Sequence, residues 1–204
     1  MGERKNFDLE YIEKELEKLS SSLRKELTVY VAGGCAMAYH RLKEATKDLD
    51  VVVRTRKESE ILIKSLIRIG YHRLKYSILG FAQRRMHAQA IVENTDGFRW
   101  DVFIEKVANK LKLTDSMRKR ATKTYERGKI KLLVLSKEDI FLMKGMTDRE
   151  LDLEDMYVMA SSGLDYGVIL KECELQSDIN ESVWESGLYT KCEELAKNMA
   201  SLCP

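Results

Sequence analysis

The chain has 204 residues, of which 44% are hydrophobic, and its formal net charge at pH 7 is only +2. This hydrophobic content supports a packed core and excludes wholesale disorder, while so small a net charge does not by itself indicate a nucleic-acid partner. No apolar run approaches the ~20 residues that a transmembrane helix needs, and the first residues lack an apolar signal core, so we expect a cytoplasmic protein with no membrane partner. The cysteines and histidines lack the spacing of a zinc site.

The amino-terminal part of the chain predicts a helix, a strand and a second helix. Apolar residues recur at three- and four-residue steps between Phe7 and Glu26, as on one face of an amphipathic helix. Thr28–Ala32 is rich in β-forming residues and predicts a short strand. Gly33 and Gly34 break this strand, and the segment "CAMAYHRLKEA" that follows them predicts a helix.

The middle of the chain predicts three strands and a helix. Leu49–Arg54 contains three consecutive valines, which is typical of a strand buried on both faces. Lys57–Ile69 predicts a helix that ends at Gly70, because glycine is favoured just beyond a helix C-terminus. Farther along, "MHAQAIVEN" and "FRWDVFIEKV" flank "TDG", and Asp-Gly between two β-rich runs predicts a hairpin.

The carboxyl-terminal part predicts one last strand and then helices. The strand is Lys129–Leu135, and Ser136 with Asp139 forms a variant capping box that opens the helix "KEDIFLMKGM". Everything after Glu150 has a helical pattern. We therefore expect an α/β (α+β) fold in which residues 1–135 form a mixed sheet flanked by helices and residues 136–204 form a helical region.

Two aspartates bring negative charge to the beginning of an apolar strand. Side chains alternate across a strand, so Asp48 and Asp50 point to one face. Two carboxylates this close would raise one of their pKa values unless a cation intervened, and a hard divalent cation with oxygen ligands, usually Mg²⁺, is the natural one. The alternative is a solvated strand end with two surface acids.

A third aspartate lies inside an apolar strand. Asp101 is flanked by Trp100 and Val102, and a carboxylate in such a strand needs a partner. The functional explanation is a third metal ligand on a strand adjacent to the first pair. The structural alternative is a salt bridge, for example to Arg99 or Arg54.

The order of these features is more specific than any one of them. Glycines after a strand let the backbone approach a phosphate closely, and here they precede an Asp-x-Asp on one strand and a distant Asp on another. This order resembles the nucleotidyltransferase superfamily typified by DNA polymerase β, whose signature is matched by Ala32-Gly33-Gly34, Asp48-Leu49-Asp50 and Asp101. The stretches "ATKDLDVVV" and "LSKEDIFLMKGMTDRELDLEDM" are also similar to the small prokaryotic proteins grouped with minimal nucleotidyltransferases and AbiEii-type toxins.

The resemblance implies a nucleotidyltransferase-like sheet and in-line attack on the α-phosphate of a nucleoside triphosphate, with two Mg²⁺ ions in the active complex. It implies that Asp48 and Asp50 ligate both ions. Asp101 is expected to ligate the catalytic ion and to help activate the acceptor hydroxyl. The residues expected to bind the nucleotide are Gly33, Gly34, Thr46, Lys47 and Lys144.

Several of the matched residues in the last stretch have structural alternatives. Lys144 can equally be a surface lysine of its helix. Arg149, Asp152 and Asp155 recur at three-residue steps, and we favour an ion network within one helix over a catalytic role for them.

Two features bear on substrate choice. Related chains often carry Arg at the position of Glu44, so its role is either lost or passed to Lys43 or Lys47. The stretch from Ser116 to Lys131 carries seven Lys/Arg and one acid, and it could attract a polyanion such as tRNA. We favour the alternative that this stretch is a solvated helix face.

We therefore expect a Mg²⁺-dependent nucleotidyltransferase that transfers an NMP, AMP for preference, from a nucleoside triphosphate to a hydroxyl acceptor. The acceptor is expected to be a protein or a tRNA, as in a toxin–antitoxin setting. The second enzyme interpretation is transfer to a small molecule such as an aminoglycoside. The non-enzyme interpretation is a nucleotide-binding or interaction module that kept the fold, and the intact set of three acids argues against it.

Overall fold

The computed structural model describes residues 4–75, 77, 79–80, 84, 86–108, 110–145, 150–180, 187–188, 190 and 192–193. The described strands are β1 (Leu27–Ala32), β2 (Asp48–Val53), β3 (His72–Arg73), β4 (Ala90–Glu93), β5 (Arg99–Ile104), β6 (Lys106–Val107), β7 (Leu111–Lys112), β8 (Thr122–Arg127) and β9 (Ile130–Val134). Within this part of the chain, seven of them form one mixed sheet in the order β3-β4-β5-β2-β1-β9-β8. β6 and β7 form a separate ribbon.

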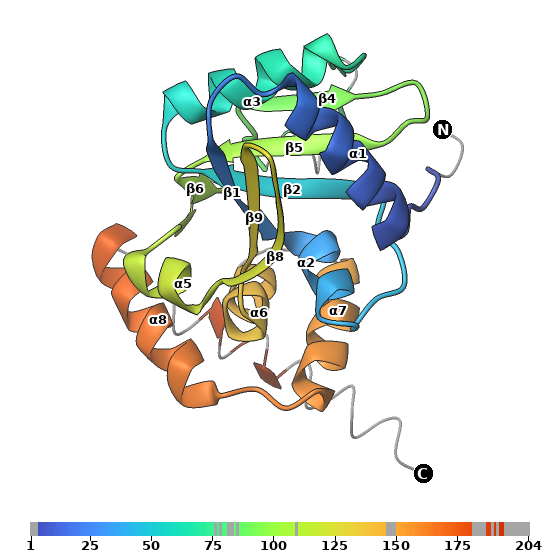
Figure 1. Cartoon of the computed structure of the whole chain (residues 1–204). Helices are drawn as coiled ribbons and strands as arrows, with labels where there is room; N and C mark the ends of the chain where they lie inside the picture. Colours follow the sequence, from blue (N-terminus) through green and yellow to red (C-terminus); the bar gives the residue numbers. More distant parts are fainter. Residues whose placement is uncertain are drawn as a thin grey trace.

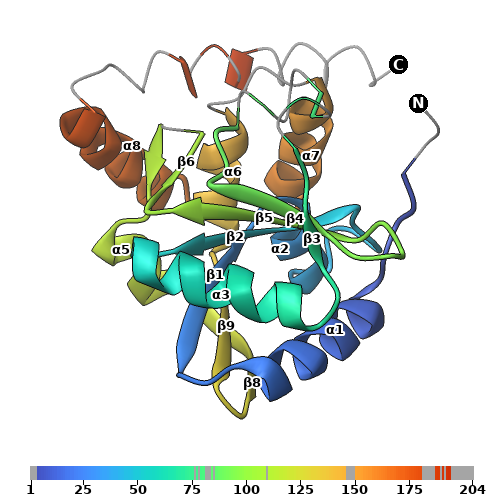
Figure 2. The ribbon, with the colours of Figure 1, turned by 90° about the horizontal axis from the view of Figure 1, so that it is seen from above.

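Helices cover both faces of this sheet. The described helices are α1 (Leu9–Ser22), α2 (Gly33–Tyr39), α3 (Arg56–Arg68), α5 (Asp115–Arg120), α6 (Lys137–Gly145), α7 (Glu150–Ser161) and α8 (Tyr166–Asn180). α1 and α3 lie over one face, while α2, α6 and α7 lie on the other side with α8 beside α6 (Figure 1 and Figure 2). This arrangement confirms the expected α/β class, a mixed sheet flanked by helices with a helical region toward the carboxyl terminus.

The strand β2 lies at the centre of the sheet. It runs antiparallel to β1 and parallel to β5, and β9 runs parallel to β1 on the far side. The register pairs Ala32 with Asp50, and Asp50 with Asp101. β4 and β5 form the hairpin predicted from the Asp-Gly turn, in which Gly97 has a φ of 84°.

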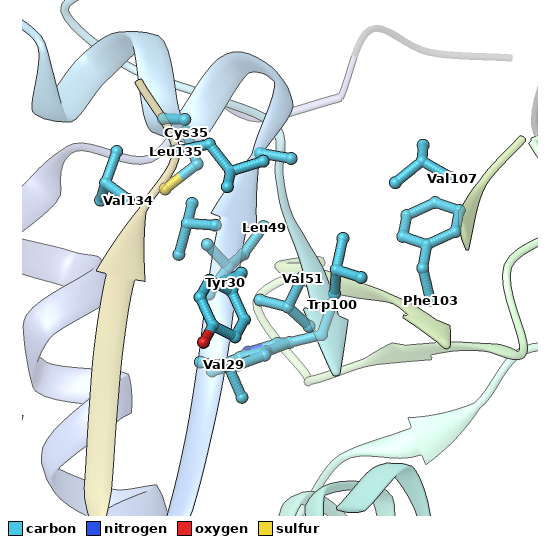
Figure 3. Packing of buried hydrophobic residues seen from close by; sticks show 14 of the residues in the cluster. Val29, Tyr30, Cys35, Leu49, Val51, Trp100, Phe103, Val107, Val134 and Leu135 are labelled. Carbon is cyan, nitrogen blue, oxygen red and sulfur yellow. The ribbon is translucent and has the colours of Figure 1, made fainter. Parts of the chain in front are cut away.

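The apolar residues of the central strands fill the space beneath the helices. Leu49, Val51 and Trp100 are fully buried (Figure 3). The indole N–H of Trp100 donates to the Tyr71 hydroxyl (3.3 Å), which in turn donates to the buried Glu15 of α1 (2.6 Å). Because side chains alternate along a strand, the aspartates of β2 and β5 face the opposite layer, the one that contains α2.

The helix α2 ends earlier than the sequence predicted. The pattern predicted a helix through residues 35–45, but α2 ends at Tyr39. Arg41 has a positive φ of 60°, and its N–H donates to the Ala38 carbonyl (2.9 Å). The Leu42 N–H donates to the Met37 carbonyl (2.9 Å), which completes a Schellman-type helix end. Arginine here takes the left-handed position that glycine usually fills, so the sequence contains no local signal for this end.

The basic stretch of residues 116–131 is not the solvated helix face that we favoured. It comprises most of the short helix α5 and the edge strand β8, which pairs with β9. Several of its cations pair with acids: Lys123 and Lys131 contact Glu126, and Arg127 contacts Glu17. Charged side chains on an edge strand disfavour pairing with a further strand, which gives this stretch a structural reason to be charged.

One cation of this stretch joins the sheet to the helical region. The Arg120 guanidinium lies 2.5 Å from Asp139 Oδ1 on α6 and 2.6 Å from Glu172 Oε2 on α8. The two carboxylate side chains are only 1% and 2% exposed. Burial raises the pKa of Asp139. Burial also acts to raise the pKa of Glu172, but hydrogen bonds from Ser116, Arg120 and Thr114 leave it below its ordinary value.

Replacing Arg120 by Met should lower the free energy of unfolding by about 2–3 kcal/mol, because two buried carboxylates lose their shared cation. Arg120 helps to hold the pKa of Glu172 below its unfolded value. The stability that this ion pair contributes is therefore fully present above the unfolded pKa of Glu172, and it is lost as the pH falls through the lowered pKa of the folded state. The destabilisation caused by Arg120→Met should therefore be smaller in acid than at neutral pH. Urea unfolding at neutral and at acidic pH measures both effects.

The matched control for this prediction is Lys123→Met, which removes an exposed ion pair of the same stretch. Its cost should be far smaller, because water already solvates both partners. Equal destabilisation by the two variants would contradict a structural role for the Arg120 cluster.

Candidate functional site

Three carboxylates lie on one face of two neighbouring strands. β2 and β5 run parallel, and their register places Asp50 beside Asp101. Asp48 precedes Asp50 by two positions on β2, so it points to the same face. Asp101 is 7% exposed, and the other two are half-buried. The structure therefore brings together the three acids that the sequence analysis selected from separate segments.

The negative charge of Asp48 and Asp50 affects the buried thiol of Cys35. Cys35 is fully buried in α2. Burial raises the pKa of the Cys35 thiol, and the charges of Asp50 and Asp48 raise it further. The thiol therefore stays protonated at neutral pH and is unsuited to nucleophilic chemistry. Since the charges of both aspartates raise the pKa of Cys35, the electrostatic potential is negative where α2 meets β2.

Gly33 lets α2 begin directly against Asp50. Its φ is 62°, a conformation that L side chains rarely adopt, and a Cβ at this position would lie 2.0 Å from Asp50 Oδ2. A Cβ on Gly34 would lie 3.1 Å from Thr46 Oγ1. Gly33 therefore allows the backbone to approach Asp50 closely, which any side chain at this position would prevent, and Gly34 lies against Thr46 in the loop that enters β2.

The loop that enters β2 is fixed by the amino-terminal segment. The Thr46 hydroxyl donates to the Asp48 carbonyl (2.9 Å), and the Thr46 backbone exchanges two hydrogen bonds with Phe7 (2.8 and 2.9 Å). Thr46 is only 5% exposed, so it has a structural role in this arrangement. The nucleotide contacts assigned to Thr46 and Lys47 stay predictions.

Arg4 is a residue of this face that the sequence analysis missed. Its Nη1 lies 2.9 Å from Asp48 Oδ2, and its Nη2 donates to the Lys47 carbonyl (2.7 Å). The side chains of Arg4 and Asp48 are 24% and 29% exposed. Arg4 precedes every predicted element and lies 44 positions from Asp48, so no local pattern could have indicated the contact.

Lys144 lies in a buried ion cluster, and the surface position that we considered for it is wrong. Its Nζ lies 2.9 Å from Asp152 Oδ1 and 2.5 Å from Asp155 Oδ2, and its side chain is 5% exposed. Lys43 also contacts Asp155 (2.8 Å). The aspartates of α7 thus pair with α6 and with the loop after α2. The network within one helix that we favoured involves Arg149, so it stays a prediction. Arg149 lies outside the described residues.

The donor chemistry of the carboxylate face fits Mg²⁺, which prefers carboxylate oxygens. Among the described residues, no three His, Cys, Asp or Glu side chains are gathered in an arrangement that could hold a metal ion. A cationic group does stand at Asp48, namely the guanidinium of Arg4. A divalent ion at this face would take its oxygen ligands from Asp48, Asp50 and Asp101, whose side chains would have to draw together around it.

Comparisons with known proteins do not identify a family. No protein-family model and no curated protein matches the chain. Among solved structures, the chain is similar to the crystal structure of JHP933 from Helicobacter pylori, with 13% sequence identity and a TM-score of 0.38. This similarity covers 93% of this chain and 94% of that chain, and it carries no statement about activity. None of the described helices is both long and apolar enough to cross a membrane.

Replacing Gly33 by Ala should displace Asp50 and lower the free energy of unfolding by about 2 kcal/mol or more, because backbone strain and a steric clash act together. The matched control is Gly97→Ala. Gly97 also has a positive φ, 84°, but a Cβ there would meet no described atom within 4 Å. Gly97→Ala should therefore cost only the backbone strain, about 1 kcal/mol. Urea unfolding measures the free energy of unfolding of both variants. If the two lose the same amount, Asp50 moves aside without cost and the close packing is not a constraint.

Proposed function

We propose that the chain is a Mg²⁺-dependent nucleotidyltransferase that transfers an NMP, AMP for preference, from a nucleoside triphosphate to a hydroxyl acceptor. The observation that supports this proposal best is the register of Asp50 beside Asp101, with Asp48 on the same face of β2. Three carboxylates on one face of largely buried strands repel one another, and a divalent cation relieves that repulsion. The resemblance of the sequence motifs to the superfamily, which includes the same three acids, points to the same activity.

The proposal gives each residue of the face a role. Asp48 and Asp50 would hold the Mg²⁺ that accompanies the triphosphate. Asp101, on the neighbouring strand, would take up the proton of the acceptor hydroxyl as its oxygen attacks the α-phosphate and pyrophosphate leaves. When bound, Mg²⁺ supplies Lewis-acid stabilisation of the charge on the phosphoryl oxygens. Gly33 lets the start of α2 pack directly against Asp50, and we assign to the backbone of Gly33 and Gly34 the approach to phosphates held at this carboxylate.

The remaining predicted nucleotide-binding residues are assigned supporting roles. Thr46 holds the loop into β2 through its bond to the Asp48 carbonyl, and Lys47 belongs to the same loop. Lys144 is held by Asp152 and Asp155, so a direct contact with phosphate would compete with two short ion pairs. We therefore assign Lys144 first to positioning the helical region and second to contact with the nucleotide.

The acceptor that we favour is a hydroxyl group of another protein. We place this reaction in the cytoplasm and in a toxin–antitoxin system. A tRNA acceptor would use a basic surface, and the basic stretch of the chain is residues 116–131, which comprise most of α5, the strand β8 and the first residues of β9. Several of its cations already pair with acids, which weakens their attraction for a polyanion. A tRNA end and a small molecule are therefore the second and third candidates.

Nucleoside triphosphate should bind only together with a divalent metal, because the carboxylate face repels the phosphates without one. Calorimetry with ATP, GTP, CTP and UTP, with and without Mg²⁺, measures this dependence. Incubation of the labelled nucleotides with total RNA and with lysate protein then shows which pool acquires label. Binding of none of the four in either condition would overturn the enzyme proposal.

Replacing Asp101 by Asn should leave metal–nucleotide binding largely intact but lower the transfer rate by roughly 10²–10³-fold, about 3–4 kcal/mol of transition-state stabilisation. Asp48→Asn and Asp50→Asn should weaken both binding and transfer, because these two carboxylates hold the ion that accompanies the triphosphate. Nucleotide affinity and transfer rate are measured for all three variants, with circular dichroism to establish folding.

The control for the three variants is Asp178→Asn, which makes the same change at an exposed position of α8. It should leave both affinity and rate at wild-type values. Near-native transfer by Asp101→Asn would mean that Asp101 is a structural residue of β5 and that the acceptor is activated elsewhere.

A further inference from the structure

Arg4 contacts Asp48 from a segment outside the sheet, and not all of its N–H groups have a hydrogen-bond acceptor among the described residues. Its Nη1 and Nη2 contact Asp48 Oδ2 and the Lys47 carbonyl, at 2.9 and 2.7 Å. Its Nε is buried and has no hydrogen-bond partner among the described residues. A guanidinium carries five N–H donors in a fixed plane, so the present contacts leave part of this group unsatisfied.

The amino-terminal segment keeps Arg4 within reach of the carboxylate face. Phe7 exchanges two backbone hydrogen bonds with Thr46 and is 3% exposed. Its ring packs against Tyr11 and Phe98, with centroids 4.6 and 5.0 Å apart. Because this anchor follows Arg4 so closely along the chain, the guanidinium can leave Asp48 and still remain beside the face.

The positive charge of Arg4 has opposite effects on two possible ligands. A bare divalent cation at Asp48 would meet a guanidinium on the same carboxylate, and the two positive charges repel. A triphosphate remains negative even with its metal, and a guanidinium binds phosphate oxygens in a bidentate geometry that suits its planar fork. The same residue therefore opposes the cation alone and favours the cation together with the nucleotide.

We infer that Arg4 makes divalent-cation binding conditional on the triphosphate: it occupies Asp48 in the free protein and moves to the phosphate oxygens in the nucleotide complex. This inference rests on the proposed function and deepens it. Thermodynamic linkage makes this coupling reciprocal. A nucleotide that draws Arg4 away from Asp48 strengthens metal binding by the same factor by which the metal strengthens nucleotide binding. Arg4 is in this sense a positioning residue, because in the free protein it acts on the metal through Asp48.

The experiment compares three variants with the wild type. Arg4→Gln removes the charge, and Arg4→Lys keeps the charge but loses the bidentate fork. Lys5→Gln is the matched control, because it makes the same charge change at the next residue, an exposed lysine whose Nζ lies 5.4 Å from the centroid of the Phe7 ring. Electron paramagnetic resonance measures the affinity for Mn²⁺ alone, and calorimetry measures the affinities for the Mg²⁺ complexes of ATP, GTP, CTP and UTP. Circular dichroism establishes folding.

Arg4→Gln should bind Mn²⁺ alone about fivefold more tightly than the wild type, and the preferred Mg²⁺–nucleotide about tenfold more weakly. Arg4→Lys should keep the wild-type Mn²⁺ affinity and lose part of the nucleotide affinity. Lys5→Gln should match the wild type in both. If Arg4→Gln matches Lys5→Gln while the wild type binds a Mg²⁺–nucleotide, the inference is wrong and the proposed function stands. If the folded wild type binds none of the four, both fall.

Discussion

The close packing of Gly33 against Asp50 is the constraint on which the rest of the candidate site depends. A Cβ at Gly33 would lie 2.0 Å from Asp50 Oδ2, so α2 can begin where it does only because no side chain stands there. Ala32, the residue before Gly33, is the partner of Asp50 in the register of β1 and β2, so strand pairing also holds Gly33 beside Asp50. The position of α2 in turn buries Cys35 beside the carboxylates and directs the following loop toward β2.

Cations from distant parts of the chain pair with acids of β2 and α7. Arg4 comes from the segment before α1 and contacts Asp48. Lys43 follows α2 but is directed to Asp155 on α7. Lys144 of α6 is likewise held by acids of α7. The two lysines pair with α7, whereas Arg4 contacts Asp48 directly, and this contact makes the amino-terminal segment part of the site.

Regular elements with strong local patterns could be predicted, and irregular ends could not. The apolar stripe between Phe7 and Glu26 predicted α1, and the Asp-Gly turn predicted the β4–β5 hairpin. The end of α2 at Tyr39 was missed because Arg41, and not glycine, takes the left-handed position there. β8 was missed because the edge strand "TKTYER" is largely exposed and has no buried face to impose an alternating apolar pattern.

The sequence by itself determined which chemical groups are available and which of them share a local face. Alternation along one strand is enough to place Asp48 and Asp50 together, since it depends only on backbone geometry. Only the tertiary structure decided that Asp101 lies beside Asp50, that Arg4 contacts Asp48, and that Lys144 is buried. The physical reason is that strand register and ion pairs between distant segments are set by how the whole core packs, whereas periodicity and turn chemistry act over a few neighbouring residues.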